Sequence, residues 1–418
     1  MITGYGTPQT ELGEAEVRDI LAKGIGSDLL SGKQVLVLTP DNTRTCPLPL
    51  IIRELARAAA PLVNRLDFMV ALGTHPPMAE DAIRELYGLT PAAGEKLLPE
   101  SRFMCHRWDL PDTLKVIGRL KADEIAEISG GLFHHGVEVS INRRIFEYDL
   151  IIILGPVFPH EVAGFSGGDK YLFPGIAGGD FLHFTHWLGA VVTNWATIGI
   201  KQTPVRQALT RAAGLVPVPR ICVSMVVRPG GGGLAGLFVG DTAASWSAAA
   251  DLSAKIHIVY QDRPFHTVLG TASPMYSELW VAGKVMYKLE PVVADGGTLI
   301  IHGKHITRVS DTWGDLLARV GYHTRDYFLK QMERFKDIPG GVLAHASHVR
   351  GMGKFENGVE KPRINVVLAT SIPEDQCRTI NLGYMDPDAV NPEAYKNKTD
   401  LGILFVEHAG EVLHRLKA

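Results

Sequence analysis

The stretch YDLIIILGP at residues 148–156 is the clearest sign of how this chain folds. Its apolar run is closed by Gly155 and Pro156 and is about half as long as a membrane span, so it predicts a buried strand. Further strands are predicted at residues 35–38 and 66–72, with helices at residues 49–60 and 78–87. Strands alternating with helices predict a parallel α/β sheet, in which ligands bind beyond the carboxyl ends of the strands.

The pattern changes after residue 220. Strands at residues 221–227 and 234–239 flank Pro229 and four glycines, which predicts a hairpin with a mobile tip. A helix at residues 243–256 leads to a second α/β unit, with strands at residues 267–270, 297–301 and 364–368. We therefore expect two α/β domains, residues 1–260 and 261–418, with a cofactor and substrate cleft between them.

Composition limits the class of protein. The 418 residues carry a net charge of −3, which gives no broad electrostatic case for nucleic acid. The four cysteines form no Cys-x-x-Cys pair, so neither a zinc site nor a disulfide framework is indicated. The first residues contain no basic segment followed by an apolar run. We expect a soluble cytoplasmic protein with no membrane or nucleic-acid partner.

Two polar clusters follow predicted strands. In TPDNTR (residues 39–44), Asp41 can accept sugar hydroxyls and Arg44 can bind a phosphate or carboxylate. In LGTH (residues 72–75), His75 can act as a general base. Taken alone, the first cluster is more typical of a turn that caps a helix, and the second is more typical of a loop histidine bound to the backbone.

The segment at residues 158–175, FPHEVAGFSGGDKYLFPG, is richer. Its glycines allow a ligand to approach the backbone closely, and successive amides could hold a phosphate. Lys170 could serve as a phosphate counter-charge or as a covalent attachment point. The segment lacks the flanking pattern of a Walker A loop, yet its glycine, histidine and lysine content favours a functional role over a plain turn.

Two helical motifs complete the candidates. His183 and His186 are three residues apart on a predicted helix, which allows a metal ligand, although paired structural histidines are commoner. His345 and His348 have the same spacing and are interpreted as structural. In WVAGK (residues 280–284), Lys284 could reach an anionic substrate.

Taken in order, these clusters resemble the lactate racemase family, whose members use a nickel-pincer nucleotide. The resemblance runs from Asp41 to Lys284 and is strongest between His160 and His186. Asp-x-Thr-Arg matches residues 41–44, and the histidine preceding Ala-Gly-Phe-Ser-Gly-Gly-x-Lys matches His160. The family pattern carries Tyr-Gln where this chain has Trp280 and Val281, and its later active-site tryptophan has no counterpart near Ala344.

The resemblance implies a role for each candidate. His75 and His160 are the expected paired catalytic bases, Lys170 the covalent tether of the cofactor, and His186 the protein ligand to nickel. Cofactor contacts are expected from Asp41, Arg44, Gly164, Ser166, Gly167 and Gly168. Substrate contacts are expected from Arg44, Trp280, Val281 and Lys284.

The implied activity is racemisation or epimerisation of a 2-hydroxy acid. C2 would be inverted by reversible hydride transfer through a 2-keto acid, with pyridinium-3,5-bisthiocarboxylate mononucleotide nickel as cofactor and the cofactor-making enzymes as protein partners. Replacing glutamine by Val281 leaves an apolar surface, which predicts a preference for apolar substrate side chains.

Two other classes remain open. An NAD-dependent 2-hydroxy-acid dehydrogenase needs Gly-x-Gly-x-x-Gly opening a helix, and neither Gly73 nor residues 164–168 supply that spacing. A nucleotide- or sugar-phosphate-binding protein would use the glycine segment but leave His75, His160, Lys170 and His186 unexplained together.

Overall fold

The structure, a computed structural model, describes residues 2–73, 75–89 and 97–417. The chain folds as two compact units. Unit 1 contains Met1–Phe158, Phe165–Leu182 and Arg206–Ile256, and unit 2 contains Pro159–Gly164, His183–Val205 and His257–Ala418. The predicted boundary at residue 260 rests on composition, which carries no sign that the two short segments at residues 159–164 and 183–205 belong with unit 2. The predicted α/β class is confirmed, whereas the cleft stays a prediction.

Within the described residues, unit 1 is built on a seven-stranded sheet of order β1-β11-β10-β7-β2-β3-β4. The strands from β10 to β4 are parallel, and β11 pairs antiparallel with both β10 and β1. The predicted β10–β11 hairpin is therefore confirmed. In the order of the sheet, the strands are β1 (Ile2–Gly6), β11 (Leu234–Gly240), β10 (Arg220–Val227), β7 (Leu150–Pro156), β2 (Gln34–Thr39), β3 (Arg65–Val70) and β4 (Phe103–Cys105).

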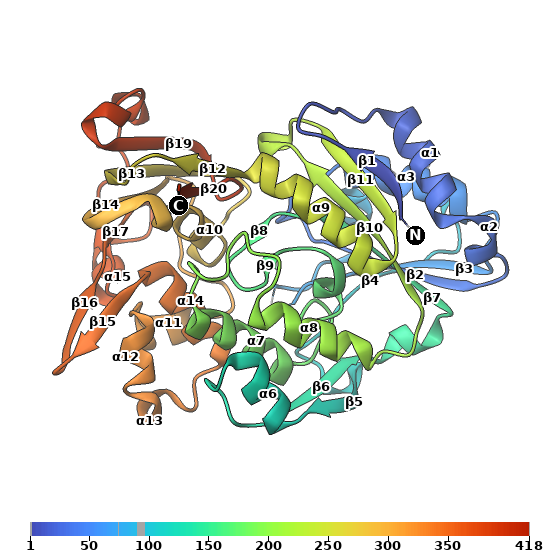
Figure 1. Cartoon of the computed structure of the whole chain (residues 1–418), viewed down its shortest axis with the longest axis horizontal. Coiled ribbons are helices and arrows are strands. Elements are labelled where there is room, and N and C mark those ends of the chain that lie inside the picture. Colours follow the sequence, from blue (N-terminus) through green and yellow to red (C-terminus); the bar gives the residue numbers. More distant parts are fainter. Residues whose placement is uncertain (1, 74, 90–96, 418) are drawn as a thin grey trace. The chain divides into compact units, whose positions relative to one another are not determined.

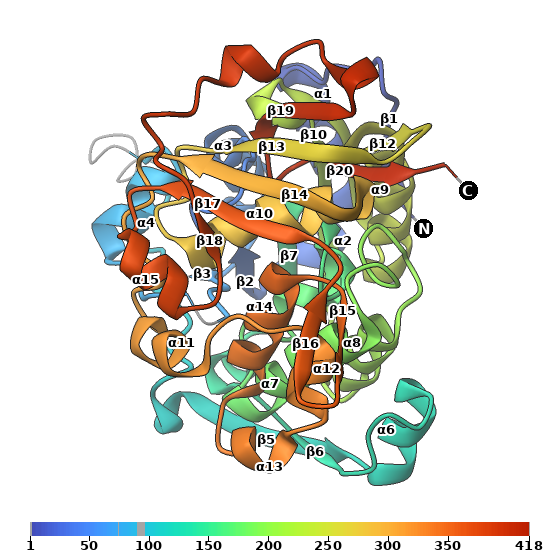
Figure 2. The same cartoon turned by 90° about the vertical axis from the view of Figure 1, so that its left-hand side faces the viewer.

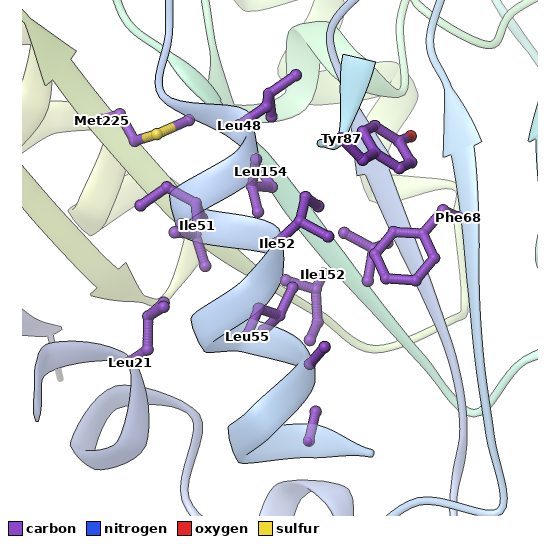
Figure 3. Packing of buried hydrophobic residues seen from close by; sticks show 14 of the residues in the cluster. Leu21, Leu48, Ile51, Ile52, Leu55, Phe68, Tyr87, Ile152, Leu154 and Met225 are labelled. Atoms are coloured by element: carbon purple, nitrogen blue, oxygen red, sulfur yellow. The ribbon is translucent and has the colours of Figure 1, made fainter. Parts of the chain in front are cut away.

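The core of unit 1 forms where helix α3 (Leu48–Ala59) packs on this sheet. Figure 3 shows Ile51, Ile52 and Leu55 of α3 pointing toward residues of the strands, among them Phe68 and Ile152. These side chains are at most 1% exposed. Helical spacing on α3 and uninterrupted apolar runs on the strands produce this contact, because a parallel strand covered on both faces has no polar side.

Other elements of unit 1 surround the sheet. Figure 1 shows α9 running beside β10 and β11, and a Cβ on Gly236 of β11 would lie 2.5 Å from Leu252 of α9. A separate antiparallel pair, β5 (Leu114–Leu120) and β6 (Val137–Asn142), was not predicted. The helices are α1 (Glu14–Ile25), α2 (Ser27–Leu30), α4 (Glu80–Leu86), α6 (Ala122–Ser129), α8 (Pro204–Gly214) and α9 (Thr242–His257).

Unit 2 contains a parallel sheet of five described strands in the order β18-β17-β14-β13-β19. Figure 2 shows β13, β14 and β17 side by side. The strands are β13 (Phe265–Ala272), β14 (Val293–Gly303), β17 (Asn365–Thr370), β18 (Gly383–Tyr384) and β19 (Ile403–Ala409). The predicted strands at residues 267–270, 297–301 and 364–368 fall on β13, β14 and β17.

Helices and two small strand pairs complete unit 2. The helices are α10 (Leu279–Leu289), α11 (Gly314–Val320), α12 (Arg325–Leu329), α13 (Met332–Phe335), α14 (Gly340–Arg350) and α15 (Glu374–Thr379). The strand pairs are β12 (Ile258–Gln261) with β20 (Leu413–Leu416), and β15 (Gly353–Glu356) with β16 (Val359–Pro362). Of the helices described in either unit, none is both long and apolar enough to cross a membrane.

Candidate active site

Two of the predicted residues meet at the carboxyl edge of the unit 1 sheet. Strands β2 and β3 pair in parallel with Thr39 opposite Val70, so the segments that follow them leave the sheet side by side. Nδ1 of His75 contacts Oδ2 of Asp41. Oδ1 of Asp41 accepts hydrogen bonds from the backbone N–H and the hydroxyl of Thr43, at 3.1 Å and 2.7 Å. Both carboxylate oxygens are thus engaged within unit 1.

The electrostatics of Asp41 favour its charged form. Burial acts to raise the pKa of Asp41, but the charge and hydrogen bond of His75 and the charge of Arg44 outweigh it, so the pKa lies well below its ordinary value. A carboxylate can only accept, so Nδ1 of His75 carries a proton. In its neutral form, His75 therefore has its lone pair on Nε2.

The glycine segment is fixed in unit 1 through its backbone carbonyls. Arg206 of α8 donates from Nη2 to Phe165 O and from Nη1 to Gly167 O, the latter at 3.3 Å. Nε1 of Trp246, on α9, donates to Ser166 O at 2.9 Å. The Ser166 hydroxyl donates to Pro156 O and accepts from Phe158 N–H, both at 2.9 Å, so it also ties the segment to the end of β7.

The glycines at the turn have no space for a side chain. Gly167 and Gly168 have φ values of +82° and +60°. A Cβ on Gly167 would lie 2.8 Å from Val157, and one on Gly168 would lie 3.1 Å from Trp246. Lys170 follows in the short 3₁₀ turn Gly168–Tyr171 and is half-buried, and its carbonyl accepts from Gly175 N–H at 3.1 Å. The backbone of the proposed tether is held on both sides.

His160 lies in unit 2 and is 7% exposed. Its Nδ1 accepts hydrogen bonds from the backbone N–H groups of Val162 and Ala163 at 3.1 Å and 3.4 Å. Gly164 belongs to the same short segment, where its positive φ and the nearby carbonyl of Ile200 exclude any side chain. Because Nδ1 accepts, the proton of neutral His160 is on Nε2, the opposite arrangement to His75.

Helix α7 (Gly179–Val192) carries the paired histidines, as predicted. His183 and His186 are both half-buried and belong to unit 2. Nδ1 of His183 accepts from Gly341 N–H at 3.3 Å, and its ring meets that of Trp313 edge-on. His183 therefore has a packing role within unit 2.

Helix α10 carries the predicted substrate residues of unit 2. The ring of Trp280 stacks on His345 with 4.2 Å between centroids, and Val281 is 6% exposed. Lys284 Nζ lies 4.7 Å from the centre of the Tyr276 ring. His345 donates from Nε2 to Trp280 O at 3.1 Å.

The histidines of α14 are buried and neutral. Burial lowers the pKa of His345 to about 3 and that of His348 to about 4. These environments agree with the structural interpretation of both residues, since a neutral buried imidazole packs as an aromatic ring. Three residues near the predicted site were not singled out by the sequence: Glu161, Arg206 and Trp246. Only the position of Glu161 next to His160 offered a signal.

Residues 5–199 match the family model described as the lactate racemase N-terminal domain. That stretch includes Asp41, His75, His160, Lys170 and His186. Over this part of its length the chain is therefore similar to the lactate racemase family. In the described residues, no three His, Cys, Asp or Glu side chains are grouped so that they could hold a metal ion by themselves.

Two curated relatives show the same similarity. The chain is 25% identical to the lactate racemase of Thermoanaerobacterium thermosaccharolyticum over 282 residues, which cover 66% of this chain and 61% of the relative. It is also 25% identical to that of Lactiplantibacillus plantarum over 313 residues, which cover 72% and 68%. The match thus spans about two thirds of each relative or slightly less.

Solved structures show the same fold. A crystal structure of a Thermotoga maritima protein has 30% identity and a TM-score of 0.89, covering 97% of this chain and 99% of the other. The lactate racemase apoprotein of T. thermosaccharolyticum has 18% identity and a TM-score of 0.71, covering 99% and 100%. At that identity the second likeness concerns the fold alone.

Proposed function

We propose that this chain belongs to the lactate racemase family and is a racemase or epimerase of 2-hydroxy acids. The observation that carries the proposal is the orientation of His75 and His160. In each ring a neighbour, Asp41 or the backbone, binds Nδ1, and we propose Nε2 as the nitrogen for proton transfer. Inverting a carbinol carbon through a planar keto acid needs proton transfer at both faces, and two such histidines meet that need.

In the proposed reaction, the C2–H bond of the substrate breaks with its electron pair while the hydroxyl proton moves to Nε2 of one histidine. The C2–O bond becomes a carbonyl. Return of hydride to the opposite face, with a proton from the other histidine, gives the inverted alcohol. The Asp41 carboxylate accepts from Nδ1 of His75, so Nε2 of that ring is the nitrogen that can take the hydroxyl proton. His160 can act through Nε2 only when Nδ1 carries a proton, and Glu161 Oε2, 3.6 Å from Nδ1, would then replace the two backbone amides as the partner of Nδ1.

The residues present fit the family's nickel-pincer nucleotide. That group brings a carbon and two sulfur donors to the metal, so it needs one protein ligand instead of a cluster, and His186 would supply it. Lys170 would hold the group covalently, on a turn whose glycines admit no side chain and allow close approach. When bound, the nucleotide supplies the hydride acceptor and donor.

Arg44 and Lys284 are the proposed partners of the substrate carboxylate or of charge developing on the C2 oxygen. Asp41, Arg44 and the segment around Gly167 are the proposed contacts to the nucleotide. For the substrate side chain, we propose an apolar preference, supported by Trp280 and Val281 within one helical turn of Lys284. Each buried methylene would favour binding by about 0.8 kcal/mol.

Intact mass tests the cofactor assignment. The chain, co-expressed with the cofactor-making enzymes, should carry a covalent mass increment, and Lys170→Ala should lack it. An unchanged increment in Lys170→Ala would contradict the tether. Wild-type chain without any increment, but binding nucleotides or oxidising a 2-hydroxy acid with NAD, would instead support one of the alternative classes.

Nickel content tests the metal ligand. His186→Ala should lose nickel from the loaded protein, while His183→Ala, whose Nδ1 is bound by Gly341, should retain it. If His186→Ala keeps nickel as tightly as wild type, the ligand is another residue.

A panel of substrates tests the specificity. Catalytic efficiency should be higher for 2-hydroxybutyrate and phenyllactate than for malate or gluconate. A clear preference for malate or gluconate would overturn the apolar proposal and leave the racemase proposal intact.

A further inference from the structure

The carbonyls of Phe165, Ser166 and Gly167 are three in succession, and each accepts a hydrogen bond from a side chain of a helix. Arg206 binds the first and third carbonyls, and Trp246 binds the middle one. Successive carbonyls all bound in this way fix the orientation of three peptide planes, because each peptide is rigid and planar. The next residue begins Gly168–Tyr171, the turn that carries Lys170.

Arg206 and Trp246 also contact each other. The guanidinium carbon of Arg206 lies 4.2 Å from the centre of the Trp246 ring, a cation–π contact. Arg206 and Trp246 are 5% and 7% exposed. Burial lowers the pKa of Arg206 to about 10, which still leaves the guanidinium charged at neutral pH.

A buried arginine costs desolvation free energy that a buried apolar side chain at the same position would not cost. Removing a guanidinium from water is unfavourable unless its donors are matched, and an apolar side chain could fill the same space without that cost. Arginine supplies what an apolar residue cannot: donors in a planar fork, able to bind two carbonyls of one segment together. Trp246 also closes the space over Gly168, so the turn cannot relax toward it.

We propose that Arg206 and Trp246 are positioning residues that hold the turn before Lys170 in the one conformation that presents its amine for attachment of the cofactor. This inference rests on the proposed function of Lys170. Attachment is a condensation: the lysine nitrogen forms a bond to the carbon of a thiocarboxylic acid arm, the C–O bond breaks, and the oxygen leaves as water with two protons, giving a thioamide. Without the two side chains the amine samples many orientations, and attachment becomes slow.

The fraction of chain carrying the mass increment measures this role directly, without an activity assay. After co-expression with the cofactor-making enzymes for a fixed time, Arg206→Met should be loaded about tenfold less than wild type, since small displacements of a reacting group have effects of this order. Arg206→Lys, which keeps the charge and one donor, should recover part of the loading. Trp246→Phe, which keeps an aromatic ring but loses the indole N–H together with the five-membered part of the indole, should load about threefold less, as expected mainly for one lost hydrogen bond.

Arg228→Met is the matched control. Arg228 is also in unit 1 and also donates to a backbone carbonyl, that of Thr10 at 2.8 Å, but it is not bound to the tether segment. Its loading should equal that of wild type at a similar loss of melting temperature. If Arg206→Met folds and is loaded as fully as wild type, the positioning role is wrong. If Arg206→Met does not fold, Trp246→Phe decides by the same measure.

The outcomes also separate this inference from the proposed function. Wild-type chain lacking any increment at Lys170 would overturn the tether itself. Wild-type chain fully loaded, with Arg206→Met, Trp246→Phe and Arg228→Met loaded equally, would overturn only the role of the two positioning residues.

Discussion

His75 in unit 1 and His160 in unit 2 are held in opposite ways. Nδ1 of His75 donates to the Asp41 carboxylate, whereas Nδ1 of His160 accepts from two backbone amides. The first contact stabilises a protonated ring, and the second stabilises a neutral ring with its proton on Nε2. Glu161 is a charged neighbour of His160. Its Oε2 lies 3.6 Å from Nδ1 of His160. Two histidines proposed for one reaction are therefore held by different kinds of partner.

Thermodynamics limits how far the different partners of His75 and His160 can affect the kinetics of the two directions. Two enantiomers have equal free energies, so the ratio kcat/KM must be the same in both directions whatever the two histidines do. Unequal histidines can change kcat and KM separately for each enantiomer, and they can change how each responds to mutation. The comparison is therefore tested by variants of the two rings and of their neighbours.

Removing either ring should have the largest effect. His75→Ala and His160→Ala should each lower the rate of racemisation by about 10³, because every complete turnover uses both. Both variants should keep the covalent increment and the nickel. Polarimetry measures the rate, and His134→Ala, an exposed histidine of unit 1, is the control. A variant that retains about a tenth of the wild-type rate or more would show that its histidine is not an acid–base group.

Asp41→Asn should lower kcat by about 10², because an amide has no charge to stabilise the protonated ring and can donate to Nδ1, which favours the other tautomer of His75. Asp149→Asn is the control, since Asp149 accepts from Gln34 N–H at the opposite end of β2. Initial rates across pH measure the effect. Full activity in Asp41→Asn would mean that His75 does not depend on this carboxylate, and the contrast with His160 would disappear.

Stability should depend on pH through the same carboxylate. The pKa of Asp41 is lower in the folded protein than its ordinary value, held down by His75 and Arg44. The Asp41 carboxylate therefore contributes fully to the free energy of unfolding above the ordinary aspartate pKa of about 3.9. This contribution is lost progressively as the pH falls below that value. Asp41→Asn should be less stable than wild type by about 1–2 kcal/mol at pH 6, and the difference should shrink at pH 3.5. Urea unfolding measures both, and a constant difference would contradict the assignment.

Glu161→Gln should have the smallest effect, lowering kcat by about threefold, in line with a partly exposed ion pair. The loss arises because the carboxylate favours the protonated ring of His160 against the two backbone amides. Glu333→Gln, an exposed residue of unit 2, is the control. A loss as large as that of Asp41→Asn would mean that both histidines are held by carboxylates to the same degree.

The sequence alone determined the strands and helices that carry most candidates. Apolar runs bounded by glycine and proline fixed β2, β3 and β7, and helical spacing fixed α3, α7 and α10. These signals are local, since period and turn chemistry act over a few residues. The resemblance then assigned roles to Asp41, His75, His160, Lys170 and His186, because their order and spacing survive in one chain.

Only the tertiary structure decided which residues meet. Asp41 and His75 are 34 residues apart, and their contact depends on the parallel pairing of β2 with β3, which no local pattern encodes. Arg206 lies 41 residues beyond Phe165, whose carbonyl it binds, and nothing near it in the sequence indicates that role. The assignment of residues 159–164 and 183–205 to unit 2 also depends on packing. Hydrophobic patterning predicts that a segment is buried. Which element it packs against depends on the strand order of the whole sheet.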